Sequence, residues 1–211
     1  MSDVVIPIVF PDYKISVSVP KAKFDPIPYF EFDNFSTSAY KERFSGLGHA
    51  GILFINGQTG STKYFEYGRY DHPAYLGKVR KIMNLPNVII SNGKINLQSL
   101  KRTLYVISDK SGHNTRIQGV YIEVPNKFDT MLGYARLRKE QNKNSNRKPY
   151  NILSNSCVHF AKEVTQKAGV NTPWMIDLRP NSYIGEFRDD FIDLDFNFHK
   201  NQLKIEGKGV F

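Results

Sequence analysis

The sequence predicts a soluble α+β fold, with residues 1–211 forming a single domain. Three observations favour this class. Short apolar or alternating runs of strand length are separated by turn-forming clusters. One segment near the C-terminus carries an apolar stripe at helical spacing. Aromatic residues make up 13% of the chain, with 15 Phe and 12 Tyr, which favours an ordered, sheet-rich protein over a disordered one.

The N-terminal part predicts two strands followed by a long loop. Residues 4–10 are mostly apolar, and residues 14–19 alternate apolar with polar side chains, the period of a half-buried strand. Pro11 and Asp12 mark the turn between them. Residues 20–47 contain several prolines and aromatics, and we expect them to form an irregular loop packed on the core.

A β-hairpin is expected next. Residues 49–56, HAGILFIN, form a continuous apolar run typical of a buried central strand. The turn-rich cluster NGQTGS occupies positions 56–61, and residues 63–70, KYFEYGRY, give the returning strand.

The middle of the chain predicts helices on both sides of another strand. Residues 74–84, 97–107 and 127–140 each place apolar side chains at helical spacing, and Asn96 is the expected N-cap of the second of these helices. Residues 116–124 read as a strand between the second and third helices.

The best-defined helix lies within residues 150–169, with Asn155 or Ser156 as its N-cap and Gly169 ending it. Residues 170–211 form a C-terminal extension with a turn at 177–180 and an aromatic run. The apolar stripe of the helix consists of Cys157, Phe160, Ala161, Val164 and Ala168.

Charge and cysteine content limit the possible partners. The single cysteine excludes an internal disulfide and a thiolate zinc site. The net charge of +9 favours anionic partners such as nucleic acid, anionic lipid or an acidic cell wall. Its densest stretch, residues 136–148, is expected to be a helix end running into a solvated loop. A nucleic-acid-binding arm is the alternative, but no nucleic-acid-binding motif supports it.

Nothing in the sequence predicts insertion into a membrane. The first twenty residues lack a basic segment followed by an apolar core, so no ordinary signal peptide is expected. No apolar run is long enough to span a bilayer. We therefore expect a protein made in the cytoplasm, whose export would use a route that reads no cleavable signal.

Cys157 is the candidate nucleophile. It is expected in the first turn of its helix, where unpaired N–H groups and the helix dipole favour a thiolate and could stabilise an oxyanion. The alternative is a small buried apolar residue, which is common for a free cysteine.

His49 is the candidate base, because it opens the buried strand and could meet a helix N-terminus there. His159 is nearer to Cys157 in sequence, but residues two apart on a helix point to nearly opposite faces. A satisfied structural histidine is the alternative for His49. The remaining histidines are expected at the surface: His72, His113 and His199.

Glu66 is the candidate for the group that orients His49, since a carboxylate in so aromatic a strand needs a partner. An ion pair with Arg69 is the alternative, and the hairpin register that decides between them is not fixed by the sequence. Tyr64 or Tyr67 could serve as the third group instead.

Two segments resemble a known superfamily. The segments GLGHAGILFINGQTGSTKYFEYG at 46–68 and YNILSNSCVHFAKEVTQKAG at 150–169 are similar to the circularly permuted branch of the NlpC/P60 papain-like cysteine peptidases and amidases. The second segment also resembles the Asn-Cys-x-His-Phe signature of the PPPDE peptidases and the lecithin:retinol acyltransferase-like group. The layout is most similar to type VI secretion effectors of the NlpC/P60 class, which cut peptidoglycan peptides.

The resemblance implies a permuted papain-like fold in which an antiparallel sheet packs against the cysteine-bearing helix. It assigns Cys157 as nucleophile, His49 as base and Glu66 as third group. Ser156 stands where the family often has Asn, with Asn155 one position earlier, and this leaves the group lining the oxyanion site open.

The implied activity is hydrolysis of amide bonds in peptidoglycan peptides by a cysteine endopeptidase or amidase. As an antibacterial effector it would be carried by the secretion machinery, act in the periplasm of a target cell and be blocked by a cognate immunity protein. No metal or organic cofactor, nucleic acid or stable membrane insertion is expected. Alternatives are an isopeptidase, a lipid acyltransferase or a non-catalytic binding module on the same scaffold.

Overall fold

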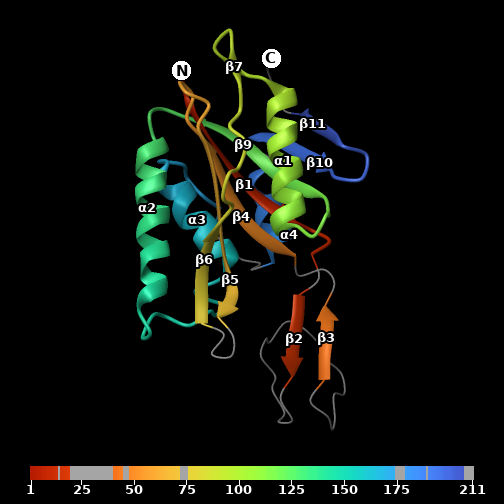
Figure 1. Cartoon of the computed structure of the whole chain (residues 1–211), viewed down its shortest axis with the longest axis vertical. Helices are drawn as coiled ribbons and strands as arrows, with labels where there is room; N and C mark the ends of the chain where they lie inside the picture. Colours follow the sequence, from red (N-terminus) through yellow and green to blue (C-terminus); the bar gives the residue numbers. More distant parts are fainter. Residues whose placement is uncertain are drawn as a thin grey trace.

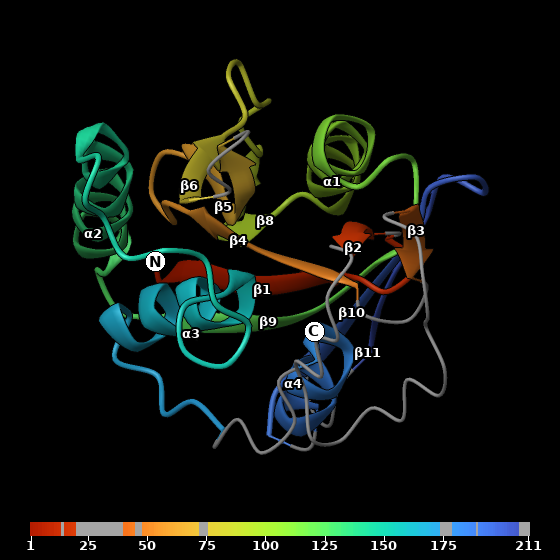
Figure 2. The same cartoon turned by 90° about the horizontal axis from the view of Figure 1, so that it is seen from below.

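The computed structural model describes residues 1–13, 15–19, 40–44, 48–71, 76–173, 179–188 and 190–206. In this part of the chain, a seven-stranded antiparallel sheet forms the centre, in the order β11-β10-β9-β1-β4-β5-β6 (Figures 1 and 2). Its strands are β1 (Asp3–Phe10), β4 (His49–Ile55), β5 (Thr62–Asp71), β6 (Leu76–Lys81), β9 (Ile117–Val124), β10 (Ile192–Asn197) and β11 (Gln202–Glu206).

Helices cover both faces of the large sheet. Helix α1 lies on one face, and α2, α3 and α4 lie on the other (Figure 2). Two small ribbons, β2 with β3 and β7 with β8, lie outside the large sheet. The bounds are α1 Leu97–Ser111, α2 Phe128–Glu140, α3 Cys157–Lys167, α4 Pro180–Phe187, β2 Ile15–Val19, β3 Tyr40–Phe44, β7 Ile90–Ser91 and β8 Lys94–Ile95, with a short 3-10 turn at Gln141–Lys143.

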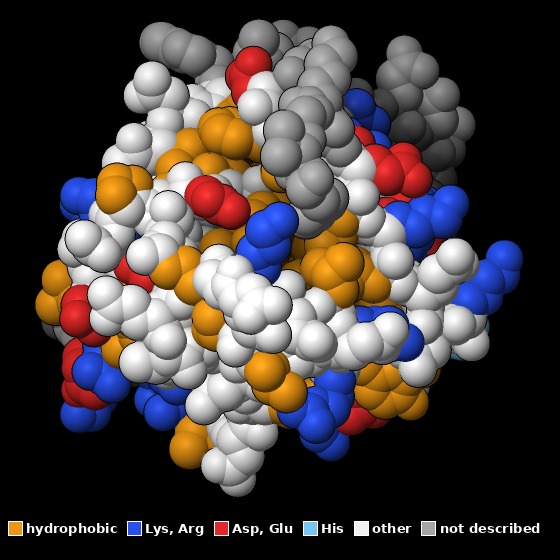
Figure 3. Space-filling model, turned by 90° about the horizontal axis from the view of Figure 1, so that it is seen from above, with side chains coloured by type: hydrophobic (Ala, Val, Ile, Leu, Met, Phe, Trp, Pro, Cys, Tyr) orange, Lys and Arg blue, Asp and Glu red, His pale blue; other side chains and the backbone are white. Residues whose placement is uncertain are grey.

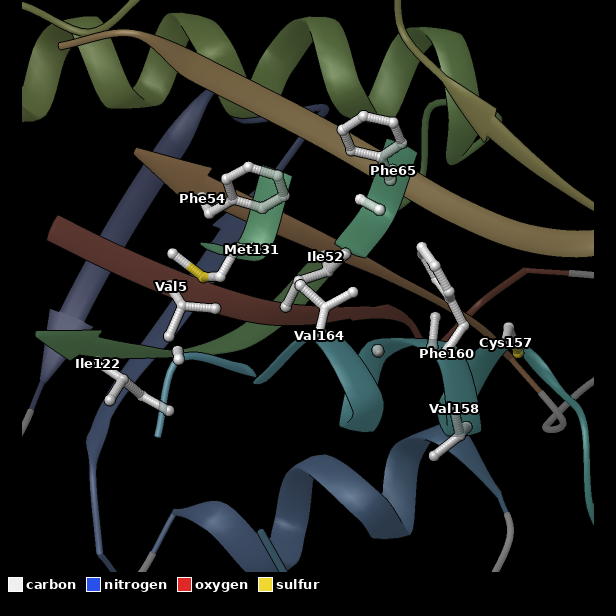
Figure 4. Close-up of a cluster of buried hydrophobic side chains, with 14 of the residues drawn as sticks. Val5, Ile52, Phe54, Phe65, Ile122, Met131, Cys157, Val158, Phe160 and Val164 are labelled. Atoms are coloured by element: carbon white, nitrogen blue, oxygen red, sulfur yellow. The ribbon is translucent and has the colours of Figure 1, made fainter. Parts of the chain in front are cut away.

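Two apolar cores result, one on each side of the sheet. Strand β1 is buried along its whole length, because its alternate side chains enter the two cores in turn. The core beneath α3 includes Ile52, Phe160 and Val164, and Figure 4 shows Phe160 and Val164 of α3 directed toward the sheet. The antiparallel sheet and the packing of the cysteine-bearing helix against it are as the sequence predicts.

Several local predictions are confirmed. Strands β4 and β5 form the expected hairpin, and β9 occupies the strand expected at 116–124. Helix α1 begins after Asn96, whose side chain accepts a hydrogen bond from the Ser99 N–H. Helix α2 matches the prediction for 127–140.

Other local predictions are wrong. Residues 76–81 form the edge strand β6 rather than part of a helix over 74–84, because Gly77 and Val79 alternate inward while their neighbours face out. The region 20–47, expected to be irregular, contains strand β3; its remaining residues lie outside the described residues. Helix α4 and the hairpin β10–β11 in the C-terminal extension were not predicted, and Trp174 lies outside the described residues.

Seen from above, the described part of the surface carries no concentrated basic patch (Figure 3). Lysine and arginine side chains lie mostly around the margin of this face and are interrupted by acidic and uncharged groups (Figure 3). Among the described residues, none of the helices is long and apolar enough to cross a membrane.

A buried carboxylate joins the start of the sheet to helix α2. Asp3 is 4% exposed and accepts hydrogen bonds from the backbone N–H groups of Gly57, at 2.9 Å, and Phe128, at 2.7 Å. The N-cap residue of α2, Lys127, makes no capping bond with its side chain. Asp3 therefore caps α2 from a distant part of the sequence and also fixes the β4–β5 turn.

Replacing Asp3 with Ala is expected to lower the free energy of unfolding by about 2–4 kcal/mol, because two buried N–H groups lose their acceptor. Urea unfolding followed by circular dichroism measures the change. Asp129→Ala is the matched control: it removes an exposed carboxylate from the first turn of the same helix, at a cost of about 0.3–1 kcal/mol. Equal losses in the two variants would show that Asp3 is not the cap.

Candidate active site

Cys157 is the first residue of α3 and is 4% exposed. Ser156 is the N-cap, and its hydroxyl lies 2.8 Å from Nδ1 of His159, which also accepts from the Ser156 N–H at 3.4 Å. His159 thus completes a capping box at the start of the helix. This is a structural role that agrees with its exclusion as the base.

Asn155 is not the N-cap; its side chain instead stabilises the segment before Cys157 through hydrogen bonds. Its amide donates to the hydroxyl of Tyr67 and to the carbonyl of Pro149, each at 2.8 Å, and its oxygen accepts from Arg138 at 3.3 Å. Tyr67 stacks on Tyr150 with ring centroids 5.7 Å apart. Tyr67 consequently supports the cysteine segment and is not positioned to orient His49.

The register of the hairpin brings His49 and Glu66 together. Gly51 pairs with Glu66, so residue 66 lies on the same face as Gly51 and His49. The His49 Nε2 atom is 3.2 Å from the Glu66 carboxylate, and both side chains are almost fully buried. Of the two alternatives for Glu66, the structure therefore gives the contact with His49. A side chain at Gly51 would overlap the Tyr64 ring, so glycine there makes room for the group beside Glu66.

Two tyrosines complete the surroundings of the carboxylate. The Tyr64 hydroxyl donates to one oxygen of Glu66 at 2.9 Å, and the Tyr70 hydroxyl donates to the other at 3.0 Å. The Tyr70 hydroxyl also lies 3.1 Å from His49 Nε2. Burial raises the pKa of Glu66, but its bonds to His49 and the tyrosines outweigh burial and lower that pKa overall. Glu66 is therefore a buried carboxylate with its acceptor sites filled.

The remaining nitrogen of His49, Nδ1, is left for Cys157, because Nε2 already contacts Glu66 and Tyr70. Burial lowers the pKa of His49, but interactions with Cys157 and Glu66 exceed it and raise the pKa to about 10. Burial raises the pKa of Cys157, but His49, the Ala50 N–H and the Tyr150 hydroxyl together lower it. These opposite shifts favour a thiolate–imidazolium pair.

Aromatic side chains enclose this pair. Phe10 stacks on the His49 ring at 6.1 Å, and Tyr13 approaches it at 5.2 Å. Tyr150 donates to the Cys157 sulfur at 3.8 Å. His113, expected at the surface, is exposed but packs edge-on against Tyr13.

Sequence reasoning named Tyr64 as a possible third group, and the structure places its hydroxyl on Glu66, but it missed Tyr13, Tyr70 and Tyr150. Tyr70 lies four residues after Glu66, which regular strand alternation would place on the same face, and although the register shifts between Gly68 and Asp71 its hydroxyl reaches Glu66. Tyr150 opens the segment that carries Cys157. No sequence pattern indicated that Tyr13 belongs to the site, because Tyr13 follows a turn and reaches His49 only through tertiary packing.

Comparisons with known proteins give two matches. The family described as "Type VI secretion system effector TseH-like" matches residues 5–172, a span that contains His49, Glu66 and Cys157. Among solved structures, the crystal structure of the type VI secretion system effector TseH is similar, with a TM-score of 0.78 and 33% sequence identity over 97% of this chain and 98% of that chain. The curated proteins contain no match.

The thiolate–imidazolium pair predicts how Cys157 reacts with iodoacetamide as pH changes. A free thiol has a pKa of about 8.5. In the wild type the alkylation rate should already be high below that pH, because the Cys157 thiolate forms at lower pH than a free thiolate does. In His49→Ala the rise should move to higher pH, since burial then loses its main opponent and is countered by the Ala50 N–H and the Tyr150 hydroxyl. At pH 7 we expect the wild type to react about tenfold faster or more, measured by mass spectrometry of the single cysteine.

Glu66→Gln should give an intermediate profile, because losing the carboxylate lowers the pKa of His49 without removing the ring. His199→Ala is the matched control, an exposed histidine outside the site. Coinciding profiles for the wild type and His49→Ala would contradict the ion pair.

Proposed function

The chain belongs to the TseH-like family of type VI secretion system effectors, and from that premise we propose that it is a cysteine endopeptidase or amidase acting on peptidoglycan peptides. The contact between His49 Nε2 and the buried carboxylate of Glu66 is the observation that carries this proposal. A buried histidine held in this way leaves one nitrogen for a thiol at a helix N-terminus, the arrangement that activates a cysteine nucleophile.

The proposed reaction proceeds through a thioester. The Cys157 thiolate attacks the carbonyl carbon of the amide, and N–H groups in the first turn of α3 stabilise the oxyanion. The C–N bond breaks as the His49 imidazolium gives its proton to the leaving amine. A water then attacks the thioester while His49 takes its proton, which releases a carboxylic acid and restores the pair.

Glu66 acts in this scheme through His49. Its carboxylate holds the ring so that Nδ1 faces the sulfur, and its charge stabilises the imidazolium at each stage. Tyr64 and Tyr70 keep Glu66 ionised by donating to both of its oxygens. The order of the chain, with the histidine strand before the cysteine helix, supports a permuted papain-like catalytic unit.

The effector family supports proposals for where the protein acts. We propose that the secretion machinery carries it to a target cell, where it acts in the periplasm on the wall. A producing cell would then need an immunity protein that covers the site formed by His49, Glu66 and Cys157.

Digestion of purified peptidoglycan tests the activity. The wild type should release new peptide fragments, identified by mass spectrometry of the products. Cys157→Ala should release none, and His49→Ala should be slower by about 10²- to 10⁴-fold. His199→Ala should match the wild type.

Equal products from the wild type and Cys157→Ala would reject cysteine hydrolysis of peptidoglycan. If the thiol also titrates as an ordinary buried cysteine, the binding-module alternative gains support. If the thiol is activated but peptidoglycan is untouched, isopeptidase and acyltransferase substrates become the next to test.

A further inference from the structure

Arg80 places a positive charge beside the candidate active site. It lies on the edge strand β6 and is exposed, and its guanidinium carbon sits 3.6 Å from the centre of the Tyr70 ring. The Tyr70 hydroxyl in turn lies 3.1 Å from His49 Nε2. A single aromatic ring therefore separates this cation from the candidate base.

Strand register puts Arg80 on the same face as the site. Arg80 pairs with Glu66, whereas the next residue, Lys81, pairs with Phe65. Because side chains alternate along a strand, Arg80 and Lys81 point to opposite faces of the sheet. Phe65 belongs to the apolar core beneath α3, so Lys81 lies away from His49.

The charge of Arg80 is not neutralised within the described residues, where no carboxylate forms an ion pair with it. Other arginines do have such pairs, among them Arg116 with Asp195, Arg138 with Glu163 and Arg147 with Asp71. The carboxylate opposite Arg80 in register, Glu66, is occupied by His49 and two tyrosines.

Arg80 and the candidate nucleophile Cys157 both influence the pKa of the same side chain, Tyr13. Burial raises the pKa of the Tyr13 hydroxyl, as do the charges of Glu66 and Cys157, while Arg80 lowers it. Arg80 and the cysteine thus act on the same hydroxyl, which belongs to the ring beside His49.

We propose that Arg80 binds a carboxylate of the substrate next to the scissile amide. A guanidinium lying over an aromatic ring keeps the N–H groups at its edge free, and that edge matches a carboxylate in two-point geometry. On the proposed function, Arg80 selects wall peptides that carry a free carboxylate beside the cleaved bond over peptides in which that group is amidated.

Alkylation with two reagents of similar size tests the site without relying on any substrate. Iodoacetate carries a carboxylate and iodoacetamide does not, and the chain has one cysteine, so each rate reports on Cys157. Access to the buried thiol and the fraction of thiolate affect both rates alike, so both factors cancel in the ratio of the two rates. Arg80→Gln should lower the iodoacetate-to-iodoacetamide ratio by about threefold to tenfold, the effect of one nearby charge in a partly solvated site.

Lys81→Gln is the matched control, because it removes the same charge from the neighbouring residue on the opposite face. Its ratio should equal that of the wild type, and high salt should bring the wild-type ratio toward that of Arg80→Gln. An unchanged ratio in Arg80→Gln overturns the proposal. Equal slowing by both reagents also overturns it, since Arg80 would then act on the thiol through Tyr70 and His49.

Digestion of acidic and amidated wall peptides separates this inference from the proposed function. Arg80→Gln should lose kcat/KM on the acidic peptide and stay near wild type on the amidated one. If the alkylation ratio falls but the wild type cleaves neither peptide, the carboxylate site stands and the proposed substrate fails. If the wild type cleaves both but Arg80→Gln changes neither their relative rates nor the alkylation ratio, the proposed function stands and the role of Arg80 fails.

Discussion

The buried carboxylate of Glu66 is the constraint on which the site depends. A charge that is 5% exposed persists only when its acceptor sites are filled, and here one histidine and two tyrosines fill them. Those partners come from positions that the hairpin register brings to one face, and Gly51 leaves the space that Tyr64 needs. Once Glu66 is fixed, the orientation of His49 follows, and with it the nitrogen available to the thiol.

The site also depends on where the two cores meet. His49 and Glu66 belong to the face of the sheet that packs with α1, whereas Cys157 comes from a helix on the other face. The thiol reaches the histidine because α3 begins beside the first residues of β4, where Ala50 offers its N–H to the sulfur. The candidate site therefore lies at the end of a strand, where side chains of both layers converge.

Local sequence patterns predicted the helix and the strand that carry Cys157 and His49, because both elements depend on interactions between residues close in sequence. The apolar stripe and its cap identified the Cys157 helix, and the continuous apolar run identified β4 with His49 at its start. The register that assigns Glu66 to His49 is a long-range property that the sequence leaves undetermined. Strand β6 was mistaken for a helix because apolar residues beyond its end coincide with helical spacing, and Tyr13 reaches the site only through tertiary packing.

The enclosure of Cys157 has a consequence for chemical durability. A low-pKa thiolate is the form of cysteine that oxidants attack most readily, and exposure decides how often they meet it. Cys157 is only 4% exposed and lies beside the Tyr150 hydroxyl, so oxidants in bulk solvent reach its sulfur less often than they reach an exposed one. With no second cysteine in the chain, an internal disulfide cannot form. Burial therefore limits oxidation of this sulfur relative to an exposed thiolate of the same pKa.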